Sequence, residues 1–267
     1  MRIARFVHDD GMSFGAVEGD PAAGPGGLTV AAIAGHPFGE VTFTGQRWSL
    51  ADVRLLSPIL PSKVVCVGRN YADHAAEQDA PVPKEPLLFL KPSTAVVGPR
   101  DAIRLPVQSA RVDHEAELAV VIGAPGARRA DRATAEKAIF GYTCANDVTA
   151  RDLQAADGQW TRAKGFDSFC PLGPWIVTDW DPADREVRCE VGADPDAREV
   201  RQLGRTAQMV FDPATLVSYV SHVMTLLPGD VVLTGTPAGV GPLAAGDSVA
   251  VAIEGIGELV NPVVAAE

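Results

Sequence analysis

Hydrophobic positions along this chain fall into short runs, which either alternate between two faces or stay apolar throughout, and Gly and Pro separate them. Residues 2–19 alternate around His8-Asp9-Asp10-Gly11, which predicts a hairpin. Residues 63–68 are apolar on both faces, as expected of a buried strand. Helical patterns are few and short, and they cover residues 71–78, 134–139, 149–156 and 213–224. The pattern therefore predicts a β-rich α+β fold.

Two prolines interrupt the pattern in the segment 57–61, just before the apolar run at 63–68. We place a domain boundary there, with a small N-terminal β-rich domain over residues 1–57 and a larger domain over residues 58–267. The chain has 267 residues, of which 46% are apolar and 21% charged, so it can bury a full hydrophobic core.

Charge and cysteine content exclude several classes of partner and site. The net charge of −11 argues against nucleic acid or an anionic membrane surface as the main partner, since either requires a basic face. No N-terminal hydrophobic signal region is present, and the longest apolar runs are too short to span a bilayer, so we expect a cytoplasmic protein. The four cysteines are widely spaced, which predicts buried apolar side chains and neither a zinc cluster nor a disulfide framework.

Three carboxylates in apolar surroundings, Glu115, Glu117 and Asp147, are the strongest candidates for chemistry. Side chains at i and i+2 of a strand share a face, so Glu115 and Glu117 project together at the start of an apolar strand. Two charges at ~4 Å repel by about 20 kcal/mol at low dielectric, an upper bound, so protons or a cation must compensate. All-oxygen ligation suits Mg²⁺, Mn²⁺ or Ca²⁺ better than zinc. The alternative for the Glu-x-Glu alone is an exposed strand end whose acids pair with arginines.

Further polar residues follow two of the apolar runs. A helix starting after Asp147 would place Arg151 and Gln154, at +4 and +7, on roughly the same side; alternatively, Asp147 merely caps that helix. His74 and Glu77 lie one helical turn apart after the buried run at 63–68, so the carboxylate can orient the imidazole as a general base. A surface His-Glu pair would show the same spacing.

Lysine is scarce, yet Lys91 and Lys164 both have apolar neighbours. A lysine near an anionic cluster keeps its proton and supplies positive charge or a proton to a developing enolate. The alternative, an aliphatic stem that carries the ammonium out to solvent, is favoured more for Lys91 than for Lys164. The segment Gly11–Gly15 fits the Gly-x-Ser-x-Gly pattern of serine hydrolases, but it opens the return strand of the first hairpin, which is the wrong context for a nucleophile elbow.

Six ordered blocks of the chain resemble the fumarylacetoacetate hydrolase family. They are the segments Gly68–His74, Phe89–Ser93, Glu115–Leu118, Asn146–Asp152, Arg162–Asp167 and Leu233–Gly241. The resemblance runs from about residue 58 to the C-terminus. Residues 1–57 resemble the short N-terminal domain of bacterial members usually labelled 2-hydroxyhepta-2,4-diene-1,7-dioate isomerase.

The resemblance implies a mixed β-roll catalytic fold, a homodimer, and a Mg²⁺, Mn²⁺ or Ca²⁺ ion bound by Glu115, Glu117 and Asp147. It implies catalytic roles for His74 and Glu77, on a lid over the substrate, and for Lys164, which faces the metal. The substrate-binding residues that it implies are Arg69, Tyr71, Lys91, Arg151, Gln154 and Thr236. The segment 191–197 departs from the Val-Asn-Gly hairpin common in the family, which leaves the register of that strand pair open.

Together these observations predict a metal-dependent enzyme acting on a small anionic 2-oxo or enol acid through an enolate. The reaction is isomerisation or decarboxylation of a hydroxyhepta-diene-dioate, or hydrolysis of a C–C bond in a diketo acid, as in the catabolism of aromatic compounds. Oxaloacetate decarboxylation is an alternative, as are a non-catalytic metal-dependent protein that binds 2-oxo acids and a metal-free hydrolase.

Overall fold

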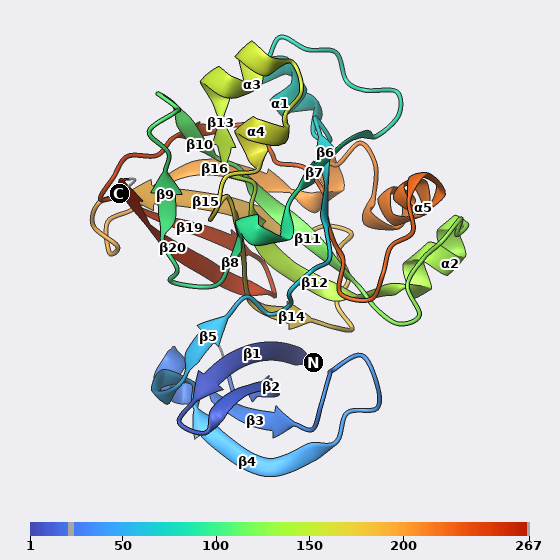
Figure 1. Cartoon of the computed structure of the whole chain (residues 1–267), viewed down its shortest axis with the longest axis vertical. Coiled ribbons are helices and arrows are strands. Elements are labelled where there is room, and N and C mark those ends of the chain that lie inside the picture. Colours follow the sequence, from blue (N-terminus) through green and yellow to red (C-terminus); the bar gives the residue numbers. More distant parts are fainter. Residues whose placement is uncertain (21–23, 266–267) are drawn as a thin grey trace.

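The computed structural model describes residues 1–20 and 24–265, and it is rich in strands (Figure 1). The N-terminal strands are β1 (Arg2–His8), β2 (Gly11–Glu18), β3 (Thr29–Ile33), β4 (Phe43–Ser49) and β5 (Arg54–Leu56). β1 and β2 form the hairpin predicted from the alternation of residues 2–19, and Gly11–Gly15 lies in its return strand. β1 also pairs with β14 (Cys170–Val177), so the N-terminal strands continue the main sheet of the chain.

Within the described residues, the main sheet has twelve strands, in the order β4-β3-β2-β1-β14-β12-β11-β17-β6-β7, with β5 and β8 paired at its sides. Its other strands are β6 (Val64–Gly68), β7 (Leu87–Lys91), β8 (Val96–Val97), β11 (Ala116–Ile122), β12 (Ile139–Asn146) and β17 (Val231–Leu233). A five-stranded sheet consists of β16 (Glu199–Arg205), β15 (Glu186–Gly192), β19 (Ser248–Ile253), β20 (Gly257–Ala265) and β9 (Ile103–Leu105). A small sheet contains β13 (Thr149–Ala150), β10 (Val112–His114) and β18 (Gly241–Pro242).

Every residue of β11 is buried, because the two faces of this strand pack into two hydrophobic clusters. Leu118 and Val120 join a cluster that reaches Val249 and Val251 of the five-stranded sheet. Ala119 packs on the opposite side of the main sheet. A strand covered on both faces is what the continuous apolar run predicts. β11 is therefore a rigid support for the carboxylates at its start.

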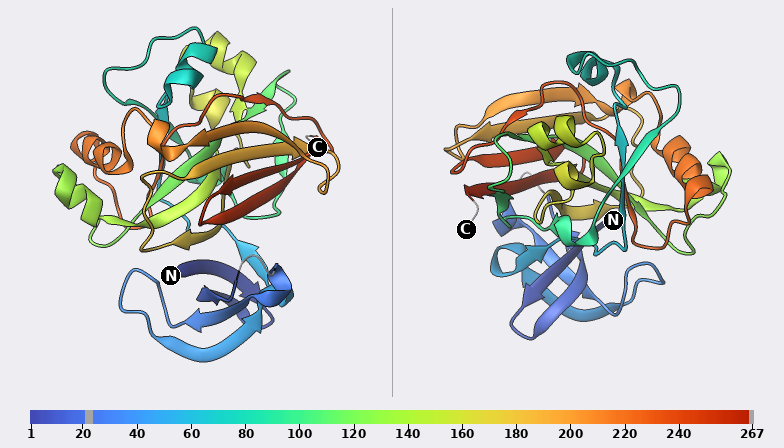
Figure 2. Two further views of the ribbon diagram at one scale, coloured as in Figure 1. Left: turned by 180° about the vertical axis from the view of Figure 1, so that it is seen from behind. Right: turned by 45° about the horizontal axis from the view of Figure 1, so that its top comes forward.

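The helices are short and lie at the margins of the sheets (Figures 1 and 2). They are α1 (Ala72–Glu77), α2 (Arg132–Lys137), α3 (Arg151–Asp157), α4 (Thr161–Lys164) and α5 (Pro213–Val223), and 3₁₀ turns cover Pro25–Gly27, Leu50–Asp52, Ser93–Ala95 and Thr206–Gln208. α1, α3 and α4 gather at the end of the molecule opposite the N-terminal strands, whereas α2 and α5 pack together at the side. None of the helices within the described residues has the length and apolar content to cross a bilayer.

Three details differ from the sequence predictions or complete them. α2 begins at Arg132 rather than at residue 134, because the Asp131 side chain accepts a hydrogen bond from the Thr134 N–H and caps the helix there. α4 was not predicted; its single turn is too short to show a hydrophobic period. The strand pair around residues 191–197, whose register the sequence left open, aligns Val191 with Glu199.

Candidate metal centre

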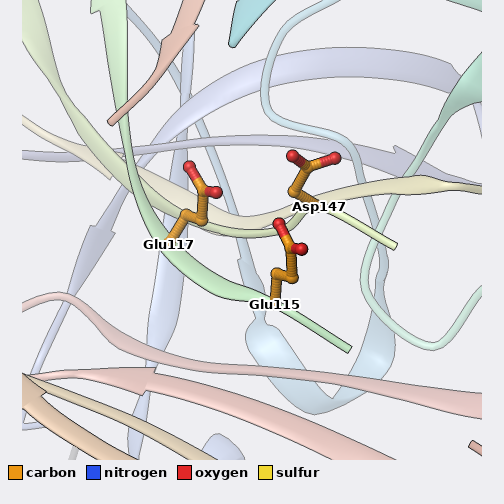
Figure 3. A group of neighbouring side chains, drawn as sticks. All are labelled: Glu115, Glu117 and Asp147. Atoms are coloured by element: carbon orange, nitrogen blue, oxygen red, sulfur yellow. The ribbon is translucent and has the colours of Figure 1, made fainter. Parts of the chain in front are cut away.

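The three predicted carboxylates converge at the point where two neighbouring strands end (Figure 3). Glu115 directly precedes β11, Glu117 is the second residue of β11, and Asp147 follows β12. β11 and β12 pair in a register that aligns Ala116 with Asn146, and the Asp147 N–H donates to the Glu115 carbonyl at 2.9 Å. One oxygen of each carboxylate lies within 4.8 Å of the others, and all three side chains are buried. The predicted cluster is therefore formed, and the exposed strand end is ruled out for Glu115 and Glu117.

Two buried lysines neutralise one side of this cluster. The Lys164 ammonium lies 2.9 Å from Glu115 Oε2 and 2.7 Å from Asp147 Oδ2. The Lys91 ammonium lies 2.8 Å from Asp147 Oδ1 and donates to the carbonyls of Val148 and Lys164. The alternative in which Lys91 extends to solvent is wrong: the residue is 1% exposed, because it ends β7 beside Val64 of β6 and its side chain points to Asp147.

Glu115 and Glu117 differ in how readily they ionise. Burial opposes ionisation of Glu115, but the Lys164 ammonium and the Arg151 guanidinium hold its pKa well below the usual range. Burial also opposes protonation of Lys164, and Asp147 and Glu115 outweigh it, so the pKa of Lys164 is raised. Glu117 makes no ion pair with any described residue, and burial, followed by the charges of Asp147 and Glu115, raises its pKa well above the usual value. Among the described residues, the Gly235 N–H donates a hydrogen bond to Glu117 Oε2 at 2.6 Å.

This arrangement fits a divalent cation. Three buried carboxylates share one centre, and one of them lacks a cationic side-chain partner among the described residues. A hard cation with oxygen ligands would compensate the charge that Glu117 carries when ionised. Glu115, Glu117 and Asp147 are the residues that could hold it.

The segment after Asp147 differs from the sequence prediction. A helix directly after Asp147 was expected, but Thr149 and Ala150 form β13, and α3 begins only at Arg151. Asp147 therefore neither shares the helix with Arg151 nor caps it; the residue at the cap position is Ala150. The reason is that β13 pairs with β10, which keeps this stretch extended.

Arg151 and Gln154 nevertheless lie close together, with Arg151 donating to Gln154 Oε1 at 3.0 Å. Arg151 also approaches Glu115 Oε1 to 2.6 Å and donates to the buried Asp113 at 2.9 Å. Sequence reasoning missed Asp113, although its place two residues before Glu115 on the same strand face was a usable signal. Asp113 therefore orients the Arg151 guanidinium, which contacts Glu115.

His74 and Glu77 lie on α1 and form the predicted pair, with Glu77 Oε2 3.1 Å from His74 Nδ1. Glu77 Oε1 accepts a hydrogen bond from the Gly239 N–H at 3.1 Å, which ties α1 to the loop after β17. The other imidazole nitrogen, Nε2, is 3.0 Å from the side-chain nitrogen of Gln78. His74 is buried, whereas Gln78 is half-buried at the C-terminal end of the helix.

A narrow cavity of about 10 Å³, room for about one water molecule, joins these groups. Eight of the predicted site residues line it: Arg69, His74, Glu115, Glu117, Asp147, Gln154, Lys164 and Thr236. The other lining residues are Val67, Gly68, Gln78, Phe89 and Trp160. Four predicted residues do not line it; they are Glu77, Tyr71, Lys91 and Arg151. Glu77, Lys91 and Arg151 contact residues that do, so they act from behind the cavity wall.

Tyr71 and Thr236 differ in how their hydroxyl groups are used. The Tyr71 hydroxyl is buried without a hydrogen-bond partner among the described residues, and burial together with the charge of Glu117 raises its pKa. The Thr236 hydroxyl donates to the Ala116 carbonyl and accepts from the Gln202 amide at 2.7 Å. Gln202 also accepts from the Ala116 N–H, so this unpredicted residue of β16 fixes the loop that carries Thr236 against β11.

The fold and the carboxylate site together define the class of protein. Residues 63–264 match the family described as "Fumarylacetoacetate (FAA) hydrolase C-terminal", and residues 1–58 match that described as "Rv2993c-like, N-terminal". The chain belongs to the fumarylacetoacetate hydrolase family, and the mixed β-roll fold implied by the sequence resemblance is confirmed.

Three relatives illustrate what the chain is similar to. A crystal structure described as 2-hydroxyhepta-2,4-diene-1,7-dioate isomerase from Mycobacterium marinum is 54% identical, with a TM-score of 0.91, and the match covers 99% of this chain and 98% of that one. The human mitochondrial oxaloacetate tautomerase FAHD2A is 46% identical over 85% of this chain and 77% of its own. A maleylpyruvate hydrolase from Sphingobium sp. SYK-6, in complex with manganese(II) and pyruvate, is 32% identical, with a TM-score of 0.78 and complete coverage of both chains.

Proposed function

We propose that this chain is a divalent-metal-dependent enzyme that acts on small 2-oxo or enol dicarboxylic acids through an enolate. Its proposed principal reaction is the keto–enol tautomerisation of an oxaloacetate-like acid. The observation that carries the proposal is the Lys164 ammonium, held between Glu115 and Asp147 in the cavity that His74 also lines. A fixed cation stabilises negative charge that develops on a substrate oxygen, and an imidazole accepts the proton.

The proposed cofactor is Mg²⁺ or Mn²⁺, with Ca²⁺ as a further hard cation that fits the Glu115, Glu117 and Asp147 oxygens. When bound, such an ion supplies Lewis acidity toward the carboxylate and keto oxygens of a 2-oxo acid. The structure of the Sphingobium relative, which contains manganese(II) and pyruvate, supports this assignment.

In the proposed reaction, His74 accepts the C3 proton of the substrate at Nε2. Nδ1 is not available for this role, since it faces the Glu77 carboxylate. Lys164 donates a hydrogen bond to the enolate oxygen and keeps its own proton, because Asp147 and Glu115 raise its pKa. His74 then returns the proton to that oxygen, so one C–H bond is broken, one O–H bond is formed, and the product is the enol.

The lining of the cavity supports a small anionic substrate. Arg69 and Gln154 line it and can bind a carboxylate of the substrate. The name of the human oxaloacetate tautomerase agrees with a small dicarboxylic substrate, and the name of the M. marinum structure agrees with an isomerase.

Hydrolysis of a C–C bond is the second candidate, and the His74–Glu77 pair favours it, because a base held by a carboxylate can also activate water. The Sphingobium relative is named as a hydrolase. Loss of CO₂ from oxaloacetate is a further outcome of the same enolate and needs no attacking water. A non-catalytic protein that binds 2-oxo acids would keep the carboxylates without turnover.

One substrate screen separates these functions. Purified protein is incubated with oxaloacetate, acetylpyruvate and a hydroxyhepta-diene-dioate, each with Mg²⁺ and with EDTA, and products are followed by ultraviolet absorbance and NMR. We expect Mg²⁺-dependent exchange between the keto and enol forms of oxaloacetate. Turnover of acetylpyruvate alone would establish the hydrolase, CO₂ release would establish the decarboxylase, and saturable binding without turnover of any substrate would refute an enzymatic role.

A further inference from the structure

The Gln78 side chain contacts His74 Nε2, the nitrogen that accepts the proton in the proposed reaction. Its side-chain nitrogen lies 3.0 Å from His74 Nε2, and its side-chain oxygen accepts a hydrogen bond from Arg69 Nε at 3.2 Å. All three side chains line the cavity. The contacts therefore form a chain from the guanidinium, through the amide, to the imidazole.

The chemistry of these groups fixes which atom donates. Arg69 can only donate, so the amide atom facing it is the oxygen, and the amide NH₂ faces His74. His74 Nδ1 faces the Glu77 carboxylate, which accepts, so Nδ1 carries the proton and Nε2 presents a lone pair. That lone pair is occupied by the Gln78 N–H. A base whose lone pair accepts a hydrogen bond from the protein is not free to remove a proton from substrate.

The Arg69 guanidinium is placed to bind a carboxylate of the substrate. Among the described residues, no carboxylate lies within ion-pair distance of its guanidinium, although acidic side chains line the same cavity. Its guanidinium carbon lies 5.9 Å from the centre of the Trp160 ring, which holds it at the cavity wall. Its backbone φ is +58°, a left-handed conformation that a non-glycine residue adopts only where the surroundings enforce it. The side chain is thus directed at Gln78 and the cavity with its charge unpaired.

We infer that Gln78 is a substrate-operated cap on the proton-accepting nitrogen of His74. A substrate carboxylate remote from the reacting carbon binds Arg69, which then releases the Gln78 oxygen, and the freed amide turns away from Nε2. The cap ties proton removal to the presence of a second carboxylate. It therefore selects dicarboxylic 2-oxo acids over monocarboxylic ones such as pyruvate. This inference rests on the proposed function, because it takes Nε2 as the proton acceptor.

The first test compares two substrates in the wild type and in the Gln78→Met variant, which keeps the side-chain volume but loses both hydrogen bonds. With Mg²⁺ present, kcat/KM is measured for deuterium exchange at C3 of pyruvate by NMR and for oxaloacetate tautomerisation by absorbance. The ratio of pyruvate to oxaloacetate kcat/KM should rise about fivefold, the size expected for one neutral hydrogen bond. The exposed Gln46 provides a matched control, and Gln46→Met should leave the ratio unchanged. An unchanged ratio in Gln78→Met would overturn the cap.

The Gln78→Glu variant tests the link to Arg69. Its carboxylate has no N–H for Nε2 and pairs with the guanidinium, so it competes with the substrate carboxylate. KM for oxaloacetate should therefore rise about fivefold, with a smaller change in kcat. A KM equal to that of the wild type would show that Arg69 does not bind the substrate carboxylate.

A chemical probe tests the cap without turnover. Diethylpyrocarbonate modifies neutral imidazole nitrogens, and peptide mass spectrometry resolves His74 from the exposed His222, which serves as an internal standard. The His74 rate relative to His222 should be about fivefold higher in Gln78→Met than in the wild type. Equal relative rates would contradict the cap even if the enzyme is active. Faster labelling in a protein that turns over neither substrate would retain the cap and refute the proposed function.

Discussion

The Glu117→Gln substitution should stabilise the metal-free protein near neutral pH and abolish its response to divalent metal. Glu117 is buried beside Glu115 and Asp147, and among the described residues it accepts a hydrogen bond from the Gly235 N–H. Burial and the two like charges raise the pKa of Glu117 well above its usual value. The metal-free folded state therefore holds a proton that the unfolded chain loses near pH ~4.3. Glutamine has the shape of the protonated acid and does not ionise.

The sign and size of the effect follow from proton linkage. Because the pKa of Glu117 is raised in the folded state, its contribution to stability is fully present below pH ~4.3 and declines as pH rises toward the folded-state pKa. The decline is about 1.4 kcal/mol per pH unit within that window, so two pH units change the free energy of unfolding by at most about 3 kcal/mol. Glutamine removes this slope. A cation at about 100 times its Kd returns about 2.7 kcal/mol to the wild type.

The assay is urea unfolding of the wild type and Glu117→Gln at pH 5.5 and pH 7.5, in EDTA and then in saturating Mn²⁺. In EDTA, the advantage of the variant should grow between the two pH values, and in Mn²⁺ only the wild type should gain stability. The exposed Glu199 provides the control, since Glu199→Gln should follow the wild type in all four conditions. An advantage that does not change with pH, or an equal gain from Mn²⁺ in both proteins, would refute the reasoning about this carboxylate.

Three further substitutions test other parts of the molecule. Lys164→Met removes the buried ammonium and should lower kcat for oxaloacetate tautomerisation at least about 100-fold, whereas Lys84→Met at an exposed site should not. His74→Asn should spare CO₂ release from oxaloacetate but abolish hydrolysis of acetylpyruvate; equal loss of both activities would contradict this division of roles. Leu118→Ala should lower the free energy of unfolding by about 2–5 kcal/mol, measured in urea, because the side chain is fully buried between the two sheets.

The sequence predicted the strand content and the burial of β11, because alternation and continuous apolar runs are local signals. It also predicted the first hairpin, whose turn residues are adjacent in the chain. It did not predict that β1 pairs with β14, about 170 residues away, since pairing between distant strands leaves no mark in either strand alone. The single turn of α4 was missed for a related reason: its place is set by packing, and Lys164 at its end is held by carboxylates from other segments.

The carboxylates were predictable because burying three acids is costly, and the sequence shows them within apolar runs. The direction of Lys91 was not predictable, since a lysine after an apolar strand can extend either inward or outward. The ion pair with Asp147, which forms only in the folded chain, decides that the Lys91 side chain points inward. Gln78 gave no signal at all: a glutamine at the end of a short helix is ordinary, and its contact with His74 Nε2 exists only in the folded chain.

The charges around the cavity favour the same substrate class as the Gln78 cap, by an independent route. When Glu117 is ionised, the charged groups around the site balance: the five carboxylates are Glu115, Glu117, Asp147, Asp113 and Glu77, and the five cations are Lys91, Lys164, Arg151, Arg111 and Arg69. A divalent cation in the triad would therefore leave the buried site with two uncompensated positive charges. A dianionic acid restores neutrality, whereas a monocarboxylate leaves one positive charge buried, at a cost that grows as water is excluded. Charge balance therefore predicts selection for a second carboxylate, and the proposed cap adds a kinetic requirement for the same group.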